Sequence, residues 1–273
     1  MRRLLATAIL TLGLVPPAAA QQLTLPMKEG STKFAVIGDS GTGGGAQREV
    51  AARLAAVHKM FPFEFTLMLG DNLYGGEGAG DYRRKFEEPY KPLLDAGVKF
   101  YASLGNHDDP TQRFYKLFNM NGERYYSFKG PKGGVRFFAL DSNYMAQQQL
   151  AWLAKDLAAS GSDWKIAFFH HPIYSSGEKH GSNEALRSQI EPLFLEHGVD
   201  VVFTGHEHFY ERLKPQKGIH YFVSGSAAKL RRGNIAESSP MTAKGFDQGY
   251  TFMIIEIDGD TMHFQTIEST GKE

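Results

Sequence analysis

The chain has 273 residues, of which 42% are hydrophobic and 22% are charged, a composition that allows a large folded domain with a substantial core. Thirty basic and thirty acidic side chains give a formal net charge of zero, which argues against a nucleic-acid-binding surface or a polybasic membrane anchor. The sequence contains no Cys, so disulfides and thiolate metal sites are excluded, and any metal must be held by oxygen and imidazole ligands.

The first twenty residues have the pattern of a signal peptide. Met1–Arg3 is basic, residues 4–15 are apolar, and Ala18–Ala20 offers a cleavage site of small residues. The apolar stretch is too short for a typical transmembrane helix, and a buried amino-terminal helix is the less favoured alternative. We expect cleavage after Ala20 and export of residues 21–273, without a membrane anchor, to a periplasm or to the medium.

Strand and helix patterns alternate along the mature chain. Unbroken apolar runs predict strands that are buried on both faces, and apolar residues at helical spacing predict amphipathic helices. Strands are expected at residues 33–38, 65–69, 98–104, 125–129, 135–140, 164–169, 199–204, 219–224, 250–257 and 262–267. Helices are expected at residues 46–60, 81–95, 147–159 and 183–197, with Gly198 as the C-cap of the last helix and a hairpin turn at 258–260. This order indicates one α/β domain, with a largely parallel sheet first and antiparallel strands towards the end.

Side chains that can bind metal ions follow five of these strands. Open α/β sheets bind their ligands beyond the carboxyl ends of the strands, so side chains in these positions are expected to converge. An aspartate can bridge two ions, and a tyrosine three residues later can reach one of them as phenolate. The polar strand ends carry Asp39, Asp71 with Tyr74, Asn106 with His107, His170, and His206 with His208.

A glycine-rich segment, Gly41–Ala46, fits the dinucleotide-binding pattern G-x-G-x-x-A between a strand and a helix. That pattern requires an acidic residue about twenty positions later, at the end of the next strand. Glu64 instead begins that strand, and Asp71 comes too late. No Lys-Ser/Thr pair follows the glycines, as a phosphate-binding P-loop would require. We therefore interpret the segment as a flexible loop that lets backbone approach the metal site.

Five short motifs occur in a fixed order: Gly38–Gly41, Gly70–Tyr74, Gly105–Asp108, Ile166–His170 and Gly205–His208. Together they resemble the motifs of the calcineurin-like metallophosphoesterases. The tyrosine in the second motif narrows the resemblance to the purple acid phosphatases, and the short chain is most similar to the tartrate-resistant branch. One position departs from the family pattern, because the fourth motif begins with Ile166 where Val is usual. The resemblance implies an α/β fold, the metallophosphoesterase β-sandwich of two mixed sheets flanked by helices.

The same resemblance implies a dinuclear metal centre. Phenolate and carboxylate donors suit a trivalent ion, whereas imidazole and amide donors suit divalent Fe, Zn or Mn. Carried over residue by residue, Fe(III) would be held by Asp39, Tyr74 and His208, the divalent ion by Asn106, His170 and His206, and Asp71 would bridge the two.

The implied activity is that of a secreted acid phosphatase, which hydrolyses small phosphomonoesters by in-line attack of a metal-bound hydroxide and releases inorganic phosphate. His107 and His180 are implied to contact the phosphate, and one of them to protonate the leaving oxygen, without an indication of which. The loop that carries His180 has one extra residue relative to the animal branch, so an exposed loop histidine remains the alternative. His171 is interpreted as spacing rather than as a ligand.

Two other functions remain open on the same residues. A phosphodiesterase or nucleotide hydrolase could use the same fold and metals, because these do not fix the substrate. A non-hydrolytic iron-binding or redox protein is less favoured, because it would not need the second set of ligands or His107. The sequence does not indicate the natural substrate, the second metal or the oligomeric state.

Overall fold

The computed structural model describes residues 23–236 and 238–270. The predicted signal peptide, residues 1–20, lies outside the described residues and stays a prediction. Within the described ranges, no helix combines the length and the apolar character needed to cross a bilayer.

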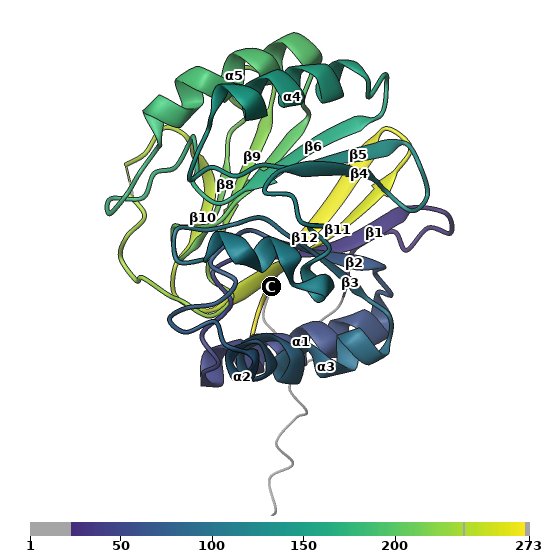
Figure 1. The fold of residues 1–273 in the computed structure, drawn as a ribbon, viewed down its shortest axis with the longest axis vertical. Coiled ribbons are helices and arrows are strands. Elements are labelled where there is room, and N and C mark those ends of the chain that lie inside the picture. The colour runs from purple at the N-terminus through teal and green to yellow at the C-terminus, as the bar shows by residue number, and fades with distance from the viewer. Residues whose placement is uncertain (1–22, 237, 271–273) are drawn as a thin grey trace, which may run out of the picture.

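Two mixed β-sheets pack face to face (Figure 1). The first sheet has the order β12-β11-β1-β2-β3, in which β1, β2 and β3 are parallel and β11 and β12 are antiparallel. Its strands are β1 (Thr32–Ile37), β2 (Phe65–Met68), β3 (Lys99–Ala102), β11 (Thr251–Asp258) and β12 (Thr261–Glu268).

The second sheet has the order β10-β8-β9-β7-β6-β5-β4, with a parallel centre of β5, β6, β7 and β9. Its strands are β4 (Tyr126–Lys129), β5 (Val135–Ala139), β6 (Trp164–Phe169), β7 (Val201–Thr204), β8 (Tyr210–Leu213), β9 (His220–Ser224) and β10 (Thr242–Phe246). The prediction of two mixed sheets flanked by helices is therefore confirmed.

Helices cover the outer face of each sheet (Figure 1). The first sheet is covered by α1 (Gly45–Met60), α2 (Ala79–Tyr82) and α3 (Glu88–Asp95), and the second by α4 (Gln147–Ala158) and α5 (Glu184–His197). Three short helical segments complete the structure: a π-helix η1 (Arg83–Glu87) and the 3₁₀-helices η2 (Pro110–Phe114) and η3 (Lys116–Phe118).

The four layers enclose three hydrophobic cores, and β1 contributes to two of them. Ala35 and Ile37 pack with the helices outside the first sheet, whereas Phe34 and Val36 pack between the two sheets. A third core joins the second sheet to α4 and α5. Because strand side chains alternate between faces, an unbroken apolar run is what this doubly covered position requires.

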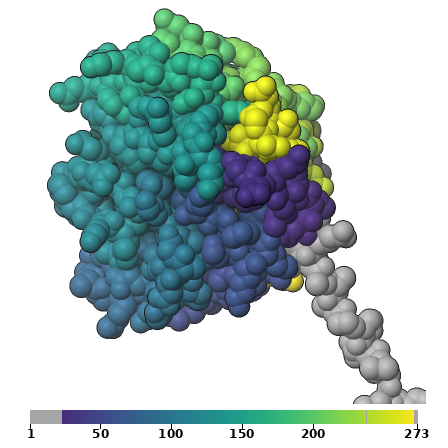
Figure 2. All heavy atoms as spheres, turned by 90° about the vertical axis from the view of Figure 1, so that its right-hand side faces the viewer, coloured from purple at the N-terminus to yellow at the C-terminus, as the bar shows by residue number. Residues whose placement is uncertain are grey.

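The structure differs from the sequence prediction in two places. The strands β8 and β10 were not predicted, because their sequences, Tyr-Glu-Arg-Leu and Thr-Ala-Lys-Gly-Phe, contain no apolar run. The helix predicted at 81–95 is interrupted by η1: Pro89 has no N–H to donate to Lys85, whose carbonyl accepts from Gln47 instead. The antiparallel strands β11 and β12, which the sequence predicts at 250–257 and 262–267, join the first sheet beside β1. Figure 2 shows the early and late parts of the chain side by side.

Candidate metal centre

The carboxyl ends of five strands meet at one edge of the sandwich, and the loops that follow them carry the predicted site residues. From the first sheet, β1 leads to Asp39, β2 to Asp71 and Tyr74, and β3 to Asn106 and His107. From the second sheet, β6 leads to His170, and β7 leads to His206 and His208. The hydrogen bonds and short contacts between these side chains bring all seven predicted ligands together.

The first group of ligands is rich in oxygen, and we call Asp39, Tyr74 and His208 the oxygen-rich half-site. The Tyr74 hydroxyl donates to Asp39 Oδ1 over 3.1 Å and lies 3.5 Å from His208 Nε2. His208 Nε2 lies 3.3 Å from the same Asp39 oxygen. Ligand atoms about 2 Å from a shared ion are separated by roughly 3 Å from one another, so these spacings suit a bound cation.

The second group consists of Asn106, His170 and His206, and we call it the imidazole half-site. His170 Nδ1 lies 2.9 Å from the Leu69 carbonyl oxygen, which can only accept, so Nδ1 carries the proton and Nε2 presents a lone pair. That lone pair faces Asn106 Oδ1 at 3.0 Å and His206 Nδ1 at 3.1 Å. The His170 lone pair and the Asn106 amide oxygen therefore face each other without a proton between them, an arrangement that a divalent cation satisfies.

Asp71 lies between the two half-sites. Its Oδ1 accepts the backbone N–H of His107 over 3.0 Å and lies 3.4 Å from His170 Nε2 in the imidazole half-site. Its carboxylate also groups with Asp39 and His208 within 4.8 Å in the oxygen-rich half-site. One buried carboxylate therefore contacts both sets of ligands.

Three of these residues have strained backbones. Asp39, Asp71 and His206 adopt positive φ values of 56°, 51° and 68°, in the left-handed region that few non-glycine residues occupy. Each follows a glycine that comes just after a strand, and the close approach leaves no room for a side chain there: a Cβ on Gly70 would lie 2.6 Å from His170 Nδ1, and one on Gly205 would lie 2.6 Å from Asp39 Oδ2. Such strain is concentrated at functional sites, where the surrounding structure maintains it.

Burial shifts the pKa values of residues in both half-sites in the direction that favours their uncharged forms. Burial raises the pKa of Asp39 well above its ordinary value, and the neighbouring Asp71 charge acts in the same direction. Burial also raises the pKa of the Tyr74 phenol, and the charges of Asp39 and Asp71 act in the same direction. Desolvation lowers the pKa of His206 to about 2 and that of His208 to about 4, so both imidazoles offer lone pairs. A bound cation would offset the cost of burying the oxygen ligands in their charged forms. The residues present therefore fit a metal centre.

A buried carboxylate outside the predicted set supports two of the ligand loops. Asp108 accepts hydrogen bonds from the backbone N–H of Gly105 over 2.8 Å, from that of Leu73 over 3.0 Å, and from Asn72 Nδ2 over 3.1 Å. Burial and the Asp71 charge raise the pKa of Asp108 to about 8. The bonds tie the loop after β2 to the loop after β3.

The glycine-rich segment has the role that its sequence suggested. A Cβ on Gly41 would lie 1.8 Å from the Asn72 carbonyl oxygen, because the two backbones touch. Gly41 N donates to the Asp71 carbonyl over 3.3 Å, and Tyr74 N donates to the Gly41 carbonyl over 2.9 Å. The segment packs against the loop that carries Asp71, as expected for a backbone that approaches the site.

The two histidines predicted to contact the phosphate lie beside different half-sites. The His107 ring lies 4.9 Å from the Tyr74 ring, beside the oxygen-rich half-site. The His180 ring lies 4.3 Å from the His206 ring, beside the imidazole half-site. His180 is exposed, but its ring rests against a predicted ligand.

Sequence reasoning missed three further groups at the site. His171 was interpreted as spacing, but its imidazole lies within 4.8 Å of the ligand atoms of His170 and His206. Lys229 Nζ lies 4.4 Å from the Tyr74 ring centroid, and Arg231 N donates to the His208 carbonyl over 3.0 Å. The position of His171 directly after His170 could have indicated that it lies at the site. Lys229 and Arg231 gave no such signal, because they follow β9, a strand whose end carries no predicted ligand.

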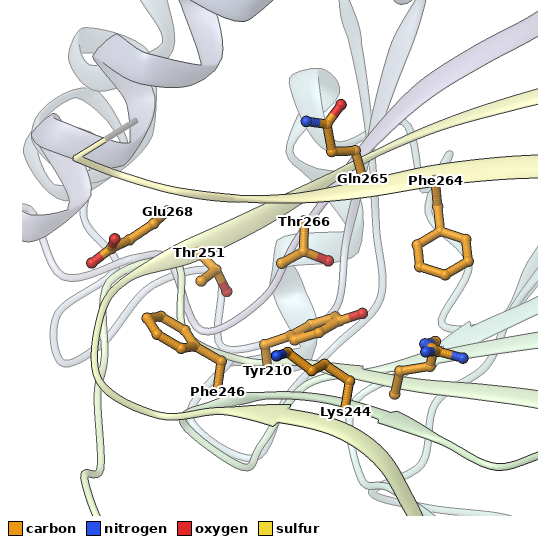
Figure 3. A pocket seen from close by; sticks show the side chains of 9 residues that line it. Tyr210, Lys244, Phe246, Thr251, Phe264, Gln265, Thr266 and Glu268 are labelled. Atoms are coloured by element: carbon orange, nitrogen blue, oxygen red, sulfur yellow. The ribbon is translucent and has the colours of Figure 1, made fainter. Parts of the chain in front are cut away.

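A cavity of about 460 Å³ lies apart from this centre, between the two sheets. It is lined by side chains of β8, β10, β11 and β12, and none of the predicted site residues is among them. Figure 3 shows Phe246 and Tyr210 opposite Thr266 and Phe264 across this space, while Gln265 points away. The chemistry-bearing residues are therefore at the strand ends and not in this cavity.

Several known proteins are similar to this chain in sequence or in fold. A profile of the calcineurin-like phosphoesterase family matches residues 32–210. The tartrate-resistant acid phosphatase type 5 of Homo sapiens is 28% identical over 309 residues, covering 92% of this chain and 93% of that protein.

Two solved structures share the fold at low identity. The purple acid phosphatase PPD1 of yellow lupin superposes with a TM-score of 0.75 at 16% identity, over 91% of this chain and 53% of that chain. GAP50, described as the anchor in the inner membrane complex of Plasmodium, also has a TM-score of 0.75, at 19% identity over 89% of this chain and 86% of that one.

Proposed function

The chain belongs to the calcineurin-like phosphoesterase family and is a metal-dependent phosphoric ester hydrolase, and on that premise we propose that it is an acid phosphatase with a dinuclear centre that acts on monoesters. The observation that carries the proposal is the pair of adjacent ligand sets that share Asp71. Lone-pair atoms of Asn106, His170 and Asp71 converge without a donor between them.

The donor chemistry supports a different ion in each half-site. Asp39 and Tyr74 supply a carboxylate and a phenolate, hard anionic donors that suit Fe(III). Asn106, His170 and His206 supply a neutral amide and two imidazoles, which suit divalent Fe, Zn or Mn. When bound, the two ions would stabilise the charge on the phosphoryl oxygens and activate the attacking water.

The side chains around the ions divide the remaining work. His107 is held by its own N–H on Asp71, so its ring is suited to bind the phosphoryl group throughout the reaction. His180 lies beside the imidazole half-site and is suited to donate a proton to the leaving oxygen. Neither ring needs to leave its position for these roles.

We further propose that the mature protein, residues 21–273, acts after export, which rests on the signal-peptide pattern of residues 1–20. Amino-terminal mass analysis of the exported protein should begin at Gln21 or its cyclised form. An intact Met1 on folded, exported protein would contradict this proposal.

The proposed activity is tested by metal analysis of the purified protein together with a panel of phosphate esters. We expect one Fe and one divalent ion per chain, and faster turnover of a mono-aryl phosphate than of a bis-aryl phosphate. Faster turnover of the bis-aryl ester would indicate a phosphodiesterase. One Fe without a second ion and without turnover would indicate an iron-binding protein.

A further inference from the structure

The loop that carries His180 is anchored to a buried carboxylate in the floor of the metal centre. The backbone N–H groups of His180 and Gly181 donate to Glu207 Oε1 over 3.0 and 2.8 Å. The same loop is tied to the segment after Arg231, because Glu178 N donates to the Asn234 carbonyl over 2.8 Å. An exposed histidine therefore has a fixed backbone.

Glu207 lies between the two ligands of the last motif and is fully buried. Its second oxygen, Oε2, accepts from Asn234 Nδ2 over 2.9 Å and pairs with Arg231 Nη1 at 3.4 Å. A buried carboxylate is tolerated only when hydrogen bonds and a counter-charge replace its water, and both oxygens of Glu207 are used in this way. Its carboxylate is directed at the His180 loop and at Arg231.

We propose that Glu207 is a positioning residue that holds His180 against the imidazole half-site and Arg231 at its rim. The inference rests on the proposed function, because it assigns His180 the proton for the leaving group. Charge-assisted bonds from two successive backbone N–H groups fix the peptide that carries the ring. The bonds to Glu207 restrict the backbone of the loop, so the conformational freedom of an exposed histidine is reduced although Glu207 does not contact its ring.

The test variant is Glu207→Gln, which keeps the volume but replaces one acceptor oxygen by an NH₂ group. That group must face either the two loop N–H donors or the Arg231 and Asn234 donors. We expect both metals to be retained, faster amide hydrogen exchange at His180 and Gly181, and a much larger loss of turnover on an alkyl phosphate than on a nitrophenyl phosphate. Combined with His180→Ala, the variant should add little further loss.

Glu178→Gln is the matched control, because it removes a glutamate charge from an exposed position on the same loop and should change none of these readouts. Asn234→Ala removes one bond to Oε2 and should give a smaller change in the same direction. Loss of metal, equal losses on both esters, or full additivity with His180→Ala would overturn the inference. If the wild type hydrolyses no ester, the proposed function fails, and unchanged hydrogen exchange in Glu207→Gln would overturn the positioning role separately.

A second observation concerns the substrate. A cavity of about 390 Å³ begins at Asn106 and His171 and extends between the loop after β3, the loop after β5 and Asn183 at the start of α5. Ser142, Asn143 and Tyr144, from the loop after β5, also line it. The cavity is continuous with the imidazole half-site, where a leaving group would emerge.

The lining of this cavity includes amide, hydroxyl and phenol groups but no Lys or Arg. Its carboxylate, Asp108, is directed inward to backbone N–H groups. Asn143 Nδ2 donates to the Gly105 carbonyl over 3.1 Å, which leaves its Oδ1 to accept from a ligand. Tyr144 is 64% exposed, and Arg124 lies 4.6 Å from its ring centroid. Amide, hydroxyl and phenol groups beside an exposed ring suit the hydroxyls and apolar face of an uncharged polyol.

We infer that this cavity is the leaving-group subsite for a sugar or polyol phosphate, an inference that also rests on the proposed function. We expect a lower KM for glucose 6-phosphate than for fructose 1,6-bisphosphate, because no Lys or Arg lines the cavity and the nearby Arg124 is already paired with Asp141. Tyr144→Ala should raise KM for glucose 6-phosphate several-fold and leave methyl phosphate unchanged, because a methyl group does not reach the ring.

Phe114→Ala is the matched control for Tyr144→Ala. Phe114 is also 64% exposed, and Arg113 lies 4.3 Å from its ring centroid, but Phe114 does not line the cavity. A lower KM for the bisphosphate, or an unchanged KM for glucose 6-phosphate in Tyr144→Ala, would overturn the subsite. Absence of turnover on methyl and nitrophenyl phosphates would instead overturn the proposed function.

Discussion

The oxygen-rich and imidazole half-sites are built in the same way, but the first relies on acidic side chains and the second on neutral imidazoles. Both place side chains on loops that follow parallel strands, and Asp71 contributes to both. In the first, burial raises the pKa values of Asp39 and Tyr74, so a cation must displace protons to bind. In the second, the pKa of His206 is lowered to about 2, so the imidazole is ready to bind a metal over the whole physiological range. These differences in charge and donor type would favour different cations in the two neighbouring sites.

The largest expected effect is at Asp71, where the two half-sites meet. Asp71→Asn keeps the side-chain volume but removes the negative charge between two cations. Even residues that only support metal ligands typically contribute 10–100-fold to metal affinity, so we expect at least that loss at both sites and near-complete loss of turnover. Metal analysis after dialysis measures it, with the exposed Asp260→Asn as the control. Full retention of both metals would contradict the shared role of Asp71.

His206→Ala should separate the half-sites. His206 Nδ1 contacts His170 Nε2 over 3.1 Å, whereas its contact with the other half-site is made by its backbone N–H, which the substitution keeps. We therefore expect the divalent ion to be lost while Fe remains, with a large fall in turnover. His220→Ala, at an exposed position at the start of β9, controls for removal of an imidazole. Equal loss of both ions would show that the two sites do not bind independently.

The two histidines outside the ligand sets should differ in their dependence on the leaving group. An alkoxide needs a proton as the P–O bond breaks, whereas a nitrophenolate does not. His180→Ala should lower turnover of an alkyl phosphate by about 10²–10⁴-fold, with a much smaller loss on nitrophenyl phosphate and both metals retained. His107→Ala should lower turnover of both esters, because its position beside Tyr74 suits phosphate binding. Equal losses on both esters for His180→Ala would assign the acid role to His107 or to water.

The sequence predicted which side chains converge at the strand ends better than it predicted what surrounds them, and the reason is physical. Asp39, Asp71 and His206 follow apolar strands directly, and a parallel sheet brings such positions to one edge. The contacts of Glu207, in contrast, join segments that are distant in sequence, which no local pattern encodes. The strands β8 and β10 escaped prediction for a similar reason, because their pairing with neighbours stabilises sequences that have little strand character of their own.

The smallest expected change is at Tyr74, where colour should change more than stability. A phenolate bound to Fe(III) absorbs visible light by charge transfer, so the loaded protein should be pink or purple. Tyr74→Phe removes the oxygen that donates to Asp39 but keeps the ring between His107 and Lys229. Its fold should survive, and the visible band should vanish even where Fe stays bound, because Asp39, Asp71 and His208 remain. Absorption spectra normalised to Fe content measure this, with the exposed Tyr144→Phe as the control. An unchanged band in Tyr74→Phe at full Fe content would show that Tyr74 only packs in the oxygen-rich half-site, and the contrast between the two half-sites would then rest on Asp39 alone.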